Sequence, residues 1–512
     1  MSAVQAGERD VSATSSAAQG SAALIAAFFA TGVLNYVFAV VMTWLLPVDR
    51  YGMLAVIQTI LLVAATVGGA GFPWVLVREI AKGSSGQTKA DDLRAALIGN
   101  LGLGLILAAL LYGGMVTGWL HFGAGYMPLV LVALATIVSL AIYIVFAAAL
   151  QGLFRFNALA FVRGSEALGK FASGIALVVF GLGALGAVLG TLIGTVVGML
   201  LSVKLVGDVK FWRGRGWGSR QMYVTSLPFF IGMLSLWTLG YVDTLGLKLF
   251  SPSAISDELT GYYQAAATLT RIPLFMAGAL FEVIFSYVAR YSNDPSMGSV
   301  YARLTMKYTL LFIVPVDLML MVIPDGVIRL LYSSKYDSSA RPLVFAAFGC
   351  LLLVLVQALA TLLQGSGKLK VASSITFAAA VVEVVALRWF VPRLGTVGAG
   401  LGLVVAAAFG LVLLAPATFR RYQLAPRLGV VVRFAGALFI FVASLWLLPH
   451  QSRVSTVAGI LVAGVLYVLA LVRFGLLRTP DIELLVGGFP PLARRIRPVT
   501  QVIELLNPAE VY

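Results

Sequence analysis

The sequence predicts an all-α polytopic membrane protein, and three observations lead to this fold class: its composition, its apolar runs and its pattern of basic residues. Hydrophobic residues make up 60% of the 512 residues and charged residues only 11%, with a mean hydropathy of +0.98. A water-soluble domain needs far more polar surface. Runs such as 127–150 and 454–472 carry little or no charge, and about 20 such residues cross a hydrocarbon core. Helices are expected because membrane strands are shorter and alternate in polarity.

The apolar runs define about fourteen transmembrane helices. In chain order the predicted spans are residues 21–46, 52–77, 93–118, 127–150, 157–181, 183–205, 223–249, 258–289, 304–324, 342–364, 371–391, 395–418, 429–448 and 454–472. With a cytoplasmic N-terminus, 27 of the 36 Lys and Arg residues fall in cytoplasmic segments, which satisfies the positive-inside rule. The net charge of +15 is therefore a topology signal. It indicates contact with membrane lipids and no nucleic-acid partner. We expect a multi-pass protein of the cytoplasmic membrane with both termini in the cytoplasm.

An internal repeat divides these spans. LGALGAVLG at 182–190 and LGTVGAGLG at 394–402 agree at six of nine positions, and LQG at 150–152 returns at 363–365. Six spans separate the equivalent positions, so the repeats would be parallel; the alternative is convergence of small residues that favour close helix packing. Duplication predicts two six-helix lobes related by a pseudo-two-fold axis, with two C-terminal helices added. The predicted parts are a cytoplasmic tail 1–20, the N-lobe 21–206, a cytoplasmic linker 207–222, the C-lobe 223–420, spans 13 and 14 in 421–475, and a cytoplasmic tail 476–512.

Two charged residues lie within spans 7 and 8. A charge in a membrane helix costs about 2.5 to 3.5 kcal/mol on insertion scales, so it normally faces a cavity or a partner. Asp243 and Arg271 are expected at comparable depths on adjacent antiparallel helices. Asp243 is a candidate ion-coupling residue that takes a proton or cation, and Arg271 a candidate ligand of phosphate oxygens. The alternative is a static ion pair.

Spans 1, 5 and 11 supply the other candidates. Arg163 and Lys170, with Glu166 between them, share one face of span 5 and predict a basic stripe that guides a headgroup, or a set of mutually neutralised charges. Glu383 in span 11 is a second ion-coupling candidate, because spans 5 and 11 correspond in the repeat. Asn35 in span 1 is a candidate substrate contact or a hydrogen-bond partner of a neighbouring helix.

The sequence predicts no catalytic residue, no metal site and no cofactor. The two histidines, His121 and His450, are far apart, and no acid/base constellation or large extramembrane domain stands out. We therefore expect a protein that is not an enzyme.

Several short stretches in order resemble a known family over residues 20–475: LLPVDRYGMLAVIQTI, LQGLFRFNALA, YVDTLGLKLF, TGYYQAAATLTRIP and LQGSGKLKVAS. They resemble the polysaccharide transporter (oligosaccharide flippase) family of the multidrug/oligosaccharidyl-lipid/polysaccharide exporter (MOP) superfamily. The turn at Ser333–Tyr336 departs from the family by lacking its usual glycine. The resemblance implies flipping of a polyprenyl-diphosphate-linked oligosaccharide by alternating access, for the biosynthesis of a cell-surface polysaccharide.

The partners implied are the lipid-linked oligosaccharide, membrane lipids and a proton or monovalent cation, with glycan-assembly enzymes as further candidates. Two alternative functions stay open. The first is a cation-coupled exporter of small amphipathic compounds, and the second is a non-transporting membrane scaffold for glycan assembly.

Overall fold

The computed structural model describes residues 27, 29–81, 86–120, 126–207, 220–290, 295–422, 424 and 428–477. Over these ranges the regular secondary structure is helical and contains no strand, which confirms the predicted all-α fold class. The predicted N-terminal tail 1–20, most of the linker (208–219) and most of the C-terminal tail (478–512) lie outside the described residues. The predicted lobe boundaries stay a prediction.

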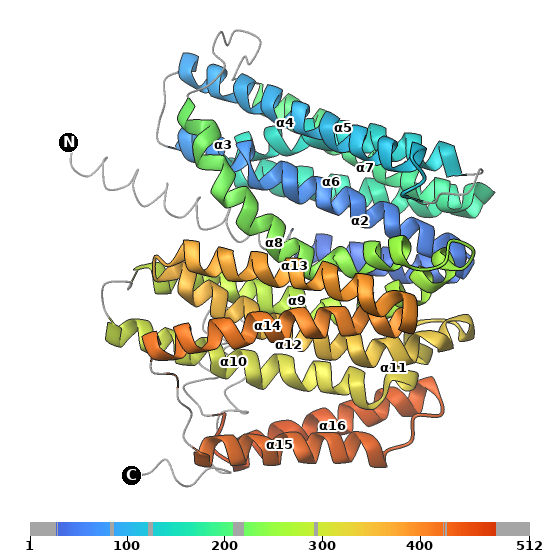
Figure 1. Cartoon of the computed structure of the whole chain (residues 1–512), viewed down its shortest axis with the longest axis vertical. Coiled ribbons are helices and arrows are strands. Elements are labelled where there is room, and N and C mark those ends of the chain that lie inside the picture. The colour runs from blue at the N-terminus through green and yellow to red at the C-terminus, as the bar shows by residue number, and fades with distance from the viewer. Residues whose placement is uncertain are drawn as a thin grey trace, which may run out of the picture. The chain divides into compact units, whose positions relative to one another are not determined.

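The chain forms two compact units (Figure 1). The first comprises residues 1–268 and 370–410, and the second residues 269–369 and 411–512. The helices of the first unit, with the start of α9 and α14, are Phe29–Leu45, α2 (Val48–Ala70), α3 (Phe72–Ala81), α4 (Gly86–Val116), α5 (Met127–Gly152), α6 (Phe156–Leu177), a π-helical turn (Val178–Leu182), α7 (Gly183–Val206), α8 (Arg220–Phe250), α9 (Ser256–Arg290), α13 (Leu369–Leu394) and α14 (Thr396–Tyr422). The second unit holds the remainder of α9 and α14 together with α10 (Pro295–Val322), α11 (Pro324–Leu331), a 3₁₀ helix (Ser334–Ser339), α12 (Ala340–Gly365), α15 (Leu428–Leu447) and α16 (Arg453–Arg473).

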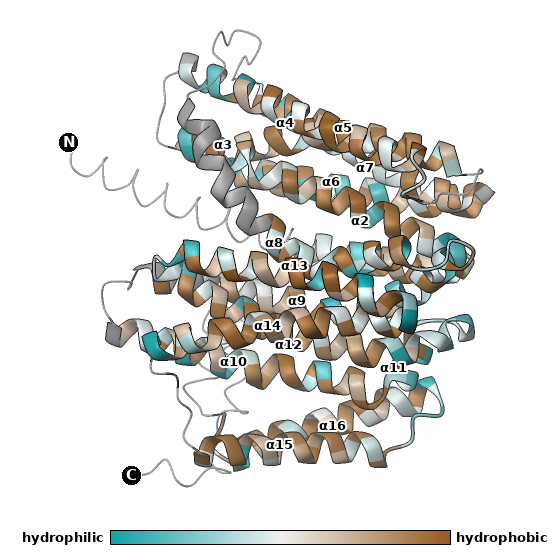
Figure 2. Ribbon diagram, in the orientation of Figure 1, coloured by the Kyte–Doolittle hydropathy of each residue, from teal (hydrophilic) through white to brown (hydrophobic). Residues whose placement is uncertain are grey.

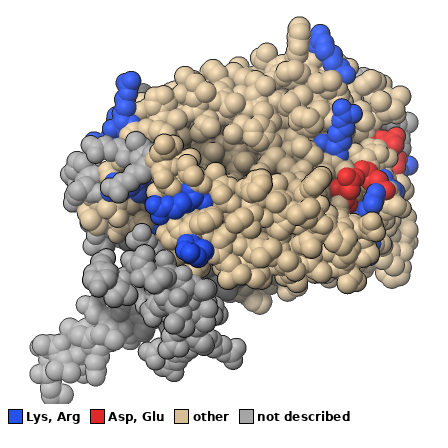
Figure 3. Space-filling view, turned by 90° about the horizontal axis from the view of Figure 1, so that it is seen from below, with Lys and Arg blue, Asp and Glu red and all other residues tan. Residues whose placement is uncertain are grey.

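An apolar exterior identifies these helices as membrane-spanning. Within the described ranges, ten helices are long and apolar enough to cross a bilayer, and hydrophobic residues dominate helices such as α5, α15 and α16 (Figure 2). Large apolar side chains are exposed along them, including Phe439 at 74% and Leu461 at 64%. On the face drawn in Figure 3, charged side chains gather toward two opposite edges and leave an uncharged band between them. Hydrocarbon chains, rather than water, suit such a surface.

Glycines bring α7 close to α6. Gly186, Gly190, Gly194 and Gly198 recur every four residues and so line one face of α7. A methyl group added to Gly190 would overlap the backbone of Gly174 on α6. Glycine is required at this crossing because any side chain would push the two backbones apart.

The repeated motif makes a similar contact later in the chain. Gly398 on α14 is 212 residues after Gly186, and a methyl group on it would lie 2.5 Å from the carbonyl oxygen of Phe390 on α13. Gly402, 212 residues after Gly190, abuts Leu387 of α13 in the same way. Both copies of the motif thus begin a helix that packs through glycine on the helix before it, as expected for a duplicated element.

Two predicted spans differ in detail from the structure. Span 52–77 is interrupted at Gly71, where α2 ends, and α2 itself begins earlier, at Val48. The break predicted near residue 182 is a π-helical turn in which Gly181 has a φ of 92°. That backbone conformation favours glycine, so the position of the break is fixed by the sequence itself.

A proline in α10 creates a contact with α16. Pro315 has no N–H, so the carbonyl of Leu311 one turn earlier cannot accept the usual helical hydrogen bond. The buried Tyr467 hydroxyl of α16 donates to this carbonyl at 3.0 Å. The Tyr467 ring also packs on Phe441 of α15, with ring centroids 5.4 Å apart. One hydroxyl therefore satisfies a carbonyl that proline released and ties the α15–α16 hairpin to α10.

We expect Tyr467→Phe to lower the stability of the purified protein by about 1 to 3 kcal/mol, because it leaves a buried carbonyl without a donor. Thermal unfolding in detergent measures this effect. Tyr262→Phe is the matched control, since its hydroxyl meets the exposed Glu258 at 3.1 Å, and its effect should stay within about 0.5 kcal/mol. Equal effects of the two substitutions would contradict the role assigned to Tyr467.

Candidate functional site

Lys170 and Asn35, both predicted substrate contacts, meet in the first unit. The Lys170 ammonium group on α6 donates to the Asn35 side-chain oxygen at 2.9 Å and lies 5.2 Å from the centre of the Phe38 ring. Asn35 is exposed and Lys170 is half-buried, so the pair can be reached from outside the protein. An ammonium group has three donors, which leaves capacity for an anionic ligand beside the bond to Asn35. Asn35 thus forms a hydrogen bond with a neighbouring helix, which is one of the two interpretations given for it above.

The rest of the predicted basic stripe lies on the same helix. Arg163 and Glu166 are half-buried on α6, on the face that also carries Lys170. The position of this face depends on α7: a methyl group on Gly194 would lie 2.5 Å from the Glu166 carbonyl oxygen and 2.7 Å from the Lys170 amide nitrogen. The glycine ladder therefore sets where the charged side chains of α6 are held.

Asp243 is buried in a hydrogen-bonded cluster between α8 and α9. It is 3% exposed, and its carboxylate accepts from the Tyr263 hydroxyl at 2.7 Å and from the Thr244 backbone N–H at 2.7 Å. Gln264 lies within hydrogen-bond distance of the Thr244 hydroxyl, at 3.2 Å. Two donors stabilise a buried carboxylate, and its surroundings offer further oxygen atoms. The site can hold a proton or a small cation.

Glu383, the second predicted ion-coupling residue, is fully buried on α13. Leu387, one turn later, packs on Gly246 of α8, and Gly246 itself lies one turn after Asp243. Spans 7 and 11 are four crossings apart, so α8 and α13 run in the same direction through a membrane. The two carboxyl groups therefore occupy similar depths on neighbouring helices.

Arg271 is buried on α9 at 8% exposure and belongs to the second unit, whereas Asp243 belongs to the first. In the second unit, the residue before it, Thr270, lies 3.4 Å from the sulfur of Cys350 on α12. The predicted pairing of Arg271 with Asp243 stays a prediction.

A profile of a known family matches residues 17–292, more than half of the chain, and its description is polysaccharide biosynthesis protein. This chain belongs to the polysaccharide biosynthesis protein family. The resemblance predicted from the sequence is thereby confirmed.

Solved structures show that this family member has the fold of MOP-superfamily proteins. The lipid II flippase MurJ, in an inward closed conformation, is 15% identical with a TM-score of 0.69, covering 87% of this chain and 97% of its own. A multidrug resistance MATE family transporter of the MOP superfamily, inward-facing, is 16% identical with a TM-score of 0.60, covering 77% of this chain and 96% of its own. An uncharacterized membrane protein of Methanocaldococcus jannaschii is 22% identical over 188 residues, and the alignment spans 36% of each protein.

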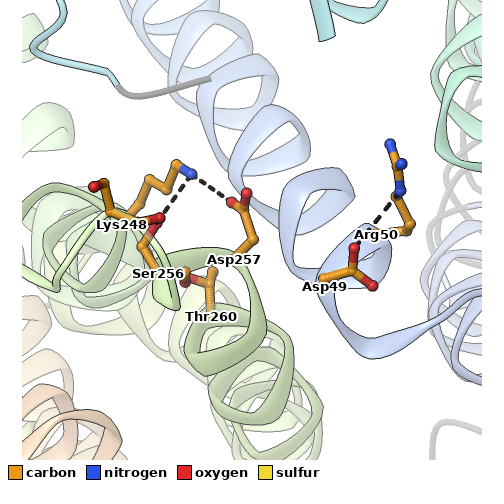
Figure 4. A network of polar contacts seen from close by, with 7 residues as sticks. Asp49, Arg50, Lys248, Ser256, Asp257 and Thr260 are labelled. Atoms are coloured by element: carbon orange, nitrogen blue, oxygen red, sulfur yellow. Dashed lines mark hydrogen bonds and ion pairs between the residues drawn. The ribbon is translucent and has the colours of Figure 1, made fainter. Parts of the chain in front are cut away.

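In this polysaccharide biosynthesis protein, a second polar cluster lies beyond the predicted site residues. Lys248 is 3% exposed, forms an ion pair with Asp257, and donates to the Ser256 hydroxyl at 3.2 Å (Figure 4). The start of α2 lies against this cluster, because a methyl group on Gly52 would overlap the backbone of Asp257. Lys248 is absent from the predicted site residues. Its spacing of nine residues from Asp257 across a short turn is the signal that could have identified the pair.

Arg50 lies beside the cluster of Figure 4, at the start of α2. Its guanidinium group is 3.6 Å from the Asp49 carboxylate and 5.0 Å from the centre of the Tyr126 ring. Burial raises the pKa of the Tyr126 phenol, which therefore stays neutral at physiological pH. These contacts join α2 to the residue that precedes α5.

Asp317 on α10 is also absent from the predicted site residues. It is fully buried in the second unit, and neither carboxylate oxygen has a hydrogen-bond partner among the residues that the structure describes. The signal was present in the sequence, since Asp317 is the acidic residue in the apolar run LLFIVPVDLMLMV within predicted span 304–324.

We expect Gly194→Ala to destabilise the protein by about 1 to 3 kcal/mol, because the added methyl meets backbone atoms of α6 that cannot move away alone. Gly164→Ala is the matched control on α6, where a methyl group would meet nothing within 4 Å. The control should be neutral or stabilising, as alanine favours helices. Thermal unfolding of both variants in detergent makes the comparison, and an undisturbed Gly194→Ala protein would contradict the close packing of α6 on α7.

Proposed function

We propose that this protein is a flippase that moves a polyprenyl-diphosphate-linked oligosaccharide across the cytoplasmic membrane by alternating access, with both termini in the cytoplasm. The observation that carries the proposal is the accessible Lys170–Asn35 pair on the basic face of α6, in a chain of the polysaccharide biosynthesis protein family. Its role is transport, and the glycan it delivers would be used by assembly enzymes on the far side of the membrane.

The chemistry of the basic face suits a diphosphate headgroup. Phosphate oxygens accept charge-assisted hydrogen bonds from ammonium and guanidinium groups, which α6 offers at Lys170 and Arg163. The two residues are seven apart, so their backbones are separated by about 10 Å along the helix axis. A headgroup could pass from one cation to the next, while Asn35 offers an amide to sugar hydroxyls. Arg271, in the second unit, stays a predicted ligand of phosphate oxygens.

Coupling to an ion gradient would use the carboxyl groups of the first unit. Asp243 and Glu383 are both buried and lie at similar depths on neighbouring helices. A proton or monovalent cation bound between or beside them would neutralise charge in a low-dielectric interior. Its release on one side of the membrane would then drive the rocking of the two predicted lobes.

A cation-coupled exporter of small amphipathic compounds is a second candidate function. The observation in its favour is the fold shared with a multidrug resistance MATE family transporter. The two candidates predict different results in cells that lack the protein. Loss of a flippase makes the lipid-linked glycan accumulate, whereas loss of an exporter leaves the lipid-linked glycan pool unchanged.

We expect Lys170→Gln to reduce flipping by about tenfold or more, because it removes a charge-assisted contact to the headgroup. Cells lacking the protein are complemented with each variant, polyprenyl-linked glycans are quantified by mass spectrometry, and leaflet exposure is probed with a membrane-impermeant glycan reagent. Lys204→Gln, at the exposed last turn of α7, is the matched control and should complement fully. An unchanged glycan pool in cells without the protein would reject the flippase proposal in favour of the exporter.

Asp243→Asn should abolish transport while expression and thermal stability remain near those of the wild type, because the amide fills the same volume but cannot take up a proton or hold a cation. Glu258→Gln removes a charge from an exposed position of α9 and should have no effect. A normal transport rate in Asp243→Asn would remove this residue from the coupling mechanism, and loss of folding would assign it a structural role.

A further inference from the structure

The second unit contains a buried acid that the proposed coupling residues do not include. Asp317 of α10 has no exposed surface, and within the described ranges both of its carboxylate oxygens lack a hydrogen-bond partner. An ionised carboxylate without a partner is strongly unfavourable in an apolar interior, whereas the protonated acid is tolerated far better. Intramembrane acids that persist despite this cost mark proton or ion pathways.

The elements packed against α10 do not supply a counter-charge among the described residues. α11, α12 and α15 contact α10, and Tyr467 of α16 reaches its backbone. Three ionisable groups of these elements contact residues other than Asp317. Arg329 pairs with Asp337 at 3.7 Å, Arg433 donates to the Phe474 carbonyl, and Cys350 lies beside Thr270. The other charged side chains of these elements are Asp325, at the exposed start of α11, Arg341, at the exposed start of α12, and the exposed Arg453 and Arg473 at the two ends of α16. α10 itself carries the exposed Arg303 and the half-buried Lys307 in its first half.

Asp317 lies just beyond a weak point of its helix. Pro315 precedes it by two residues and removes one backbone hydrogen bond from α10. The carbonyl that loses this bond belongs to Leu311, and it accepts from the Tyr467 hydroxyl instead. Thr305 and Thr309, four residues apart on α10, are also buried, and the Thr309 hydroxyl has no hydrogen-bond partner among the described residues. Asp317 follows two turns later, beyond the buried Ile313, and lies next to a position where the helix can bend.

We propose that Asp317 is a proton-binding site, distinct from Asp243 and Glu383, that carries a proton in the described conformation and releases it when bending of α10 at Pro315 opens it to water. The ligand we propose is the proton, because among the described residues neither carboxylate oxygen has a hydrogen-bond partner and no group of three or more His, Cys, Asp or Glu side chains could hold a metal ion. The use of this proton in a transport cycle rests on the proposed function, whereas its binding does not.

The first test is chemical and needs no substrate. Dicyclohexylcarbodiimide, a hydrophobic reagent for protonated carboxyl groups, is applied to the purified protein in detergent, and modified peptides are identified by mass spectrometry. We expect labelling of Asp317 to exceed that of the exposed Asp325 by about tenfold or more at neutral pH, because the reagent enters apolar surroundings and burial without a partner favours the protonated acid. Asp317→Asn should abolish that label. An unlabelled Asp317 in the folded protein, with labelling after unfolding, would overturn the proposal, as would protection by sodium ions at constant pH.

The second test asks whether the proton is used. In the complementation assay, Asp317→Asn should lower flipping by about tenfold or more, Asp317→Glu should restore part of it, and Asp325→Asn should match the wild type. A fully active, folded Asp317→Asn protein would overturn the role in transport. If wild-type protein itself does not change the lipid-linked glycan pool, the proposed function fails while the labelling result still decides whether Asp317 binds a proton. If Asp317→Asn does not fold, labelling of the wild type and activity of Asp317→Glu decide the question.

Discussion

Polar groups in a hydrocarbon core have no water to bind, and this constraint governs most of the specific contacts in the protein. Several threonines in the helices, among them Thr66, Thr136, Thr195, Thr238 and Thr418, donate to the carbonyl one turn earlier. Where no local acceptor or donor suffices, a second helix supplies one. Asn100 of α4 donates to the Ala141 carbonyl of α5 at 2.7 Å, and Tyr422 of α14 donates to the Leu362 carbonyl of α12 at 3.0 Å.

The same constraint explains why a helix can be interrupted without being lost. At Pro315 the released carbonyl of Leu311 finds the Tyr467 hydroxyl, so the irregularity is satisfied by protein and not exposed to lipid. Since apolar burial drives little association between helices in lipid, close packing has to come from small residues. The glycines of α7 do this against α6, and the repeated motif in α14 does it against α13.

Hydrogen bonding of buried polar groups and close packing through glycine together position the charged side chains of the protein. The glycine ladder holds the α6 face that carries Lys170, and the accessible Lys170–Asn35 pair gives the first unit a site for an anionic headgroup. Asp243 is held by hydrogen bonds from Tyr263 and Thr244, whereas Asp317 accepts none from the part of the chain that the structure describes. The environments of the two acids therefore differ.

The sequence by itself determined the all-α membrane fold, the approximate spans, the repeat and the family, because hydropathy, span length and motif order are local properties set by bilayer thickness. It also identified Asp243, Lys170 and Asn35 as candidates, since polar side chains stand out in apolar runs. Only the tertiary structure decided that Lys170 meets Asn35 across 135 residues, that Lys248 is buried against Asp257, and that Asp317 is buried without a hydrogen bond among the described residues. Such pairings depend on how each helix is rotated about its axis and how closely it approaches its neighbour. Both are set by side-chain packing between distant segments, which no single apolar run encodes.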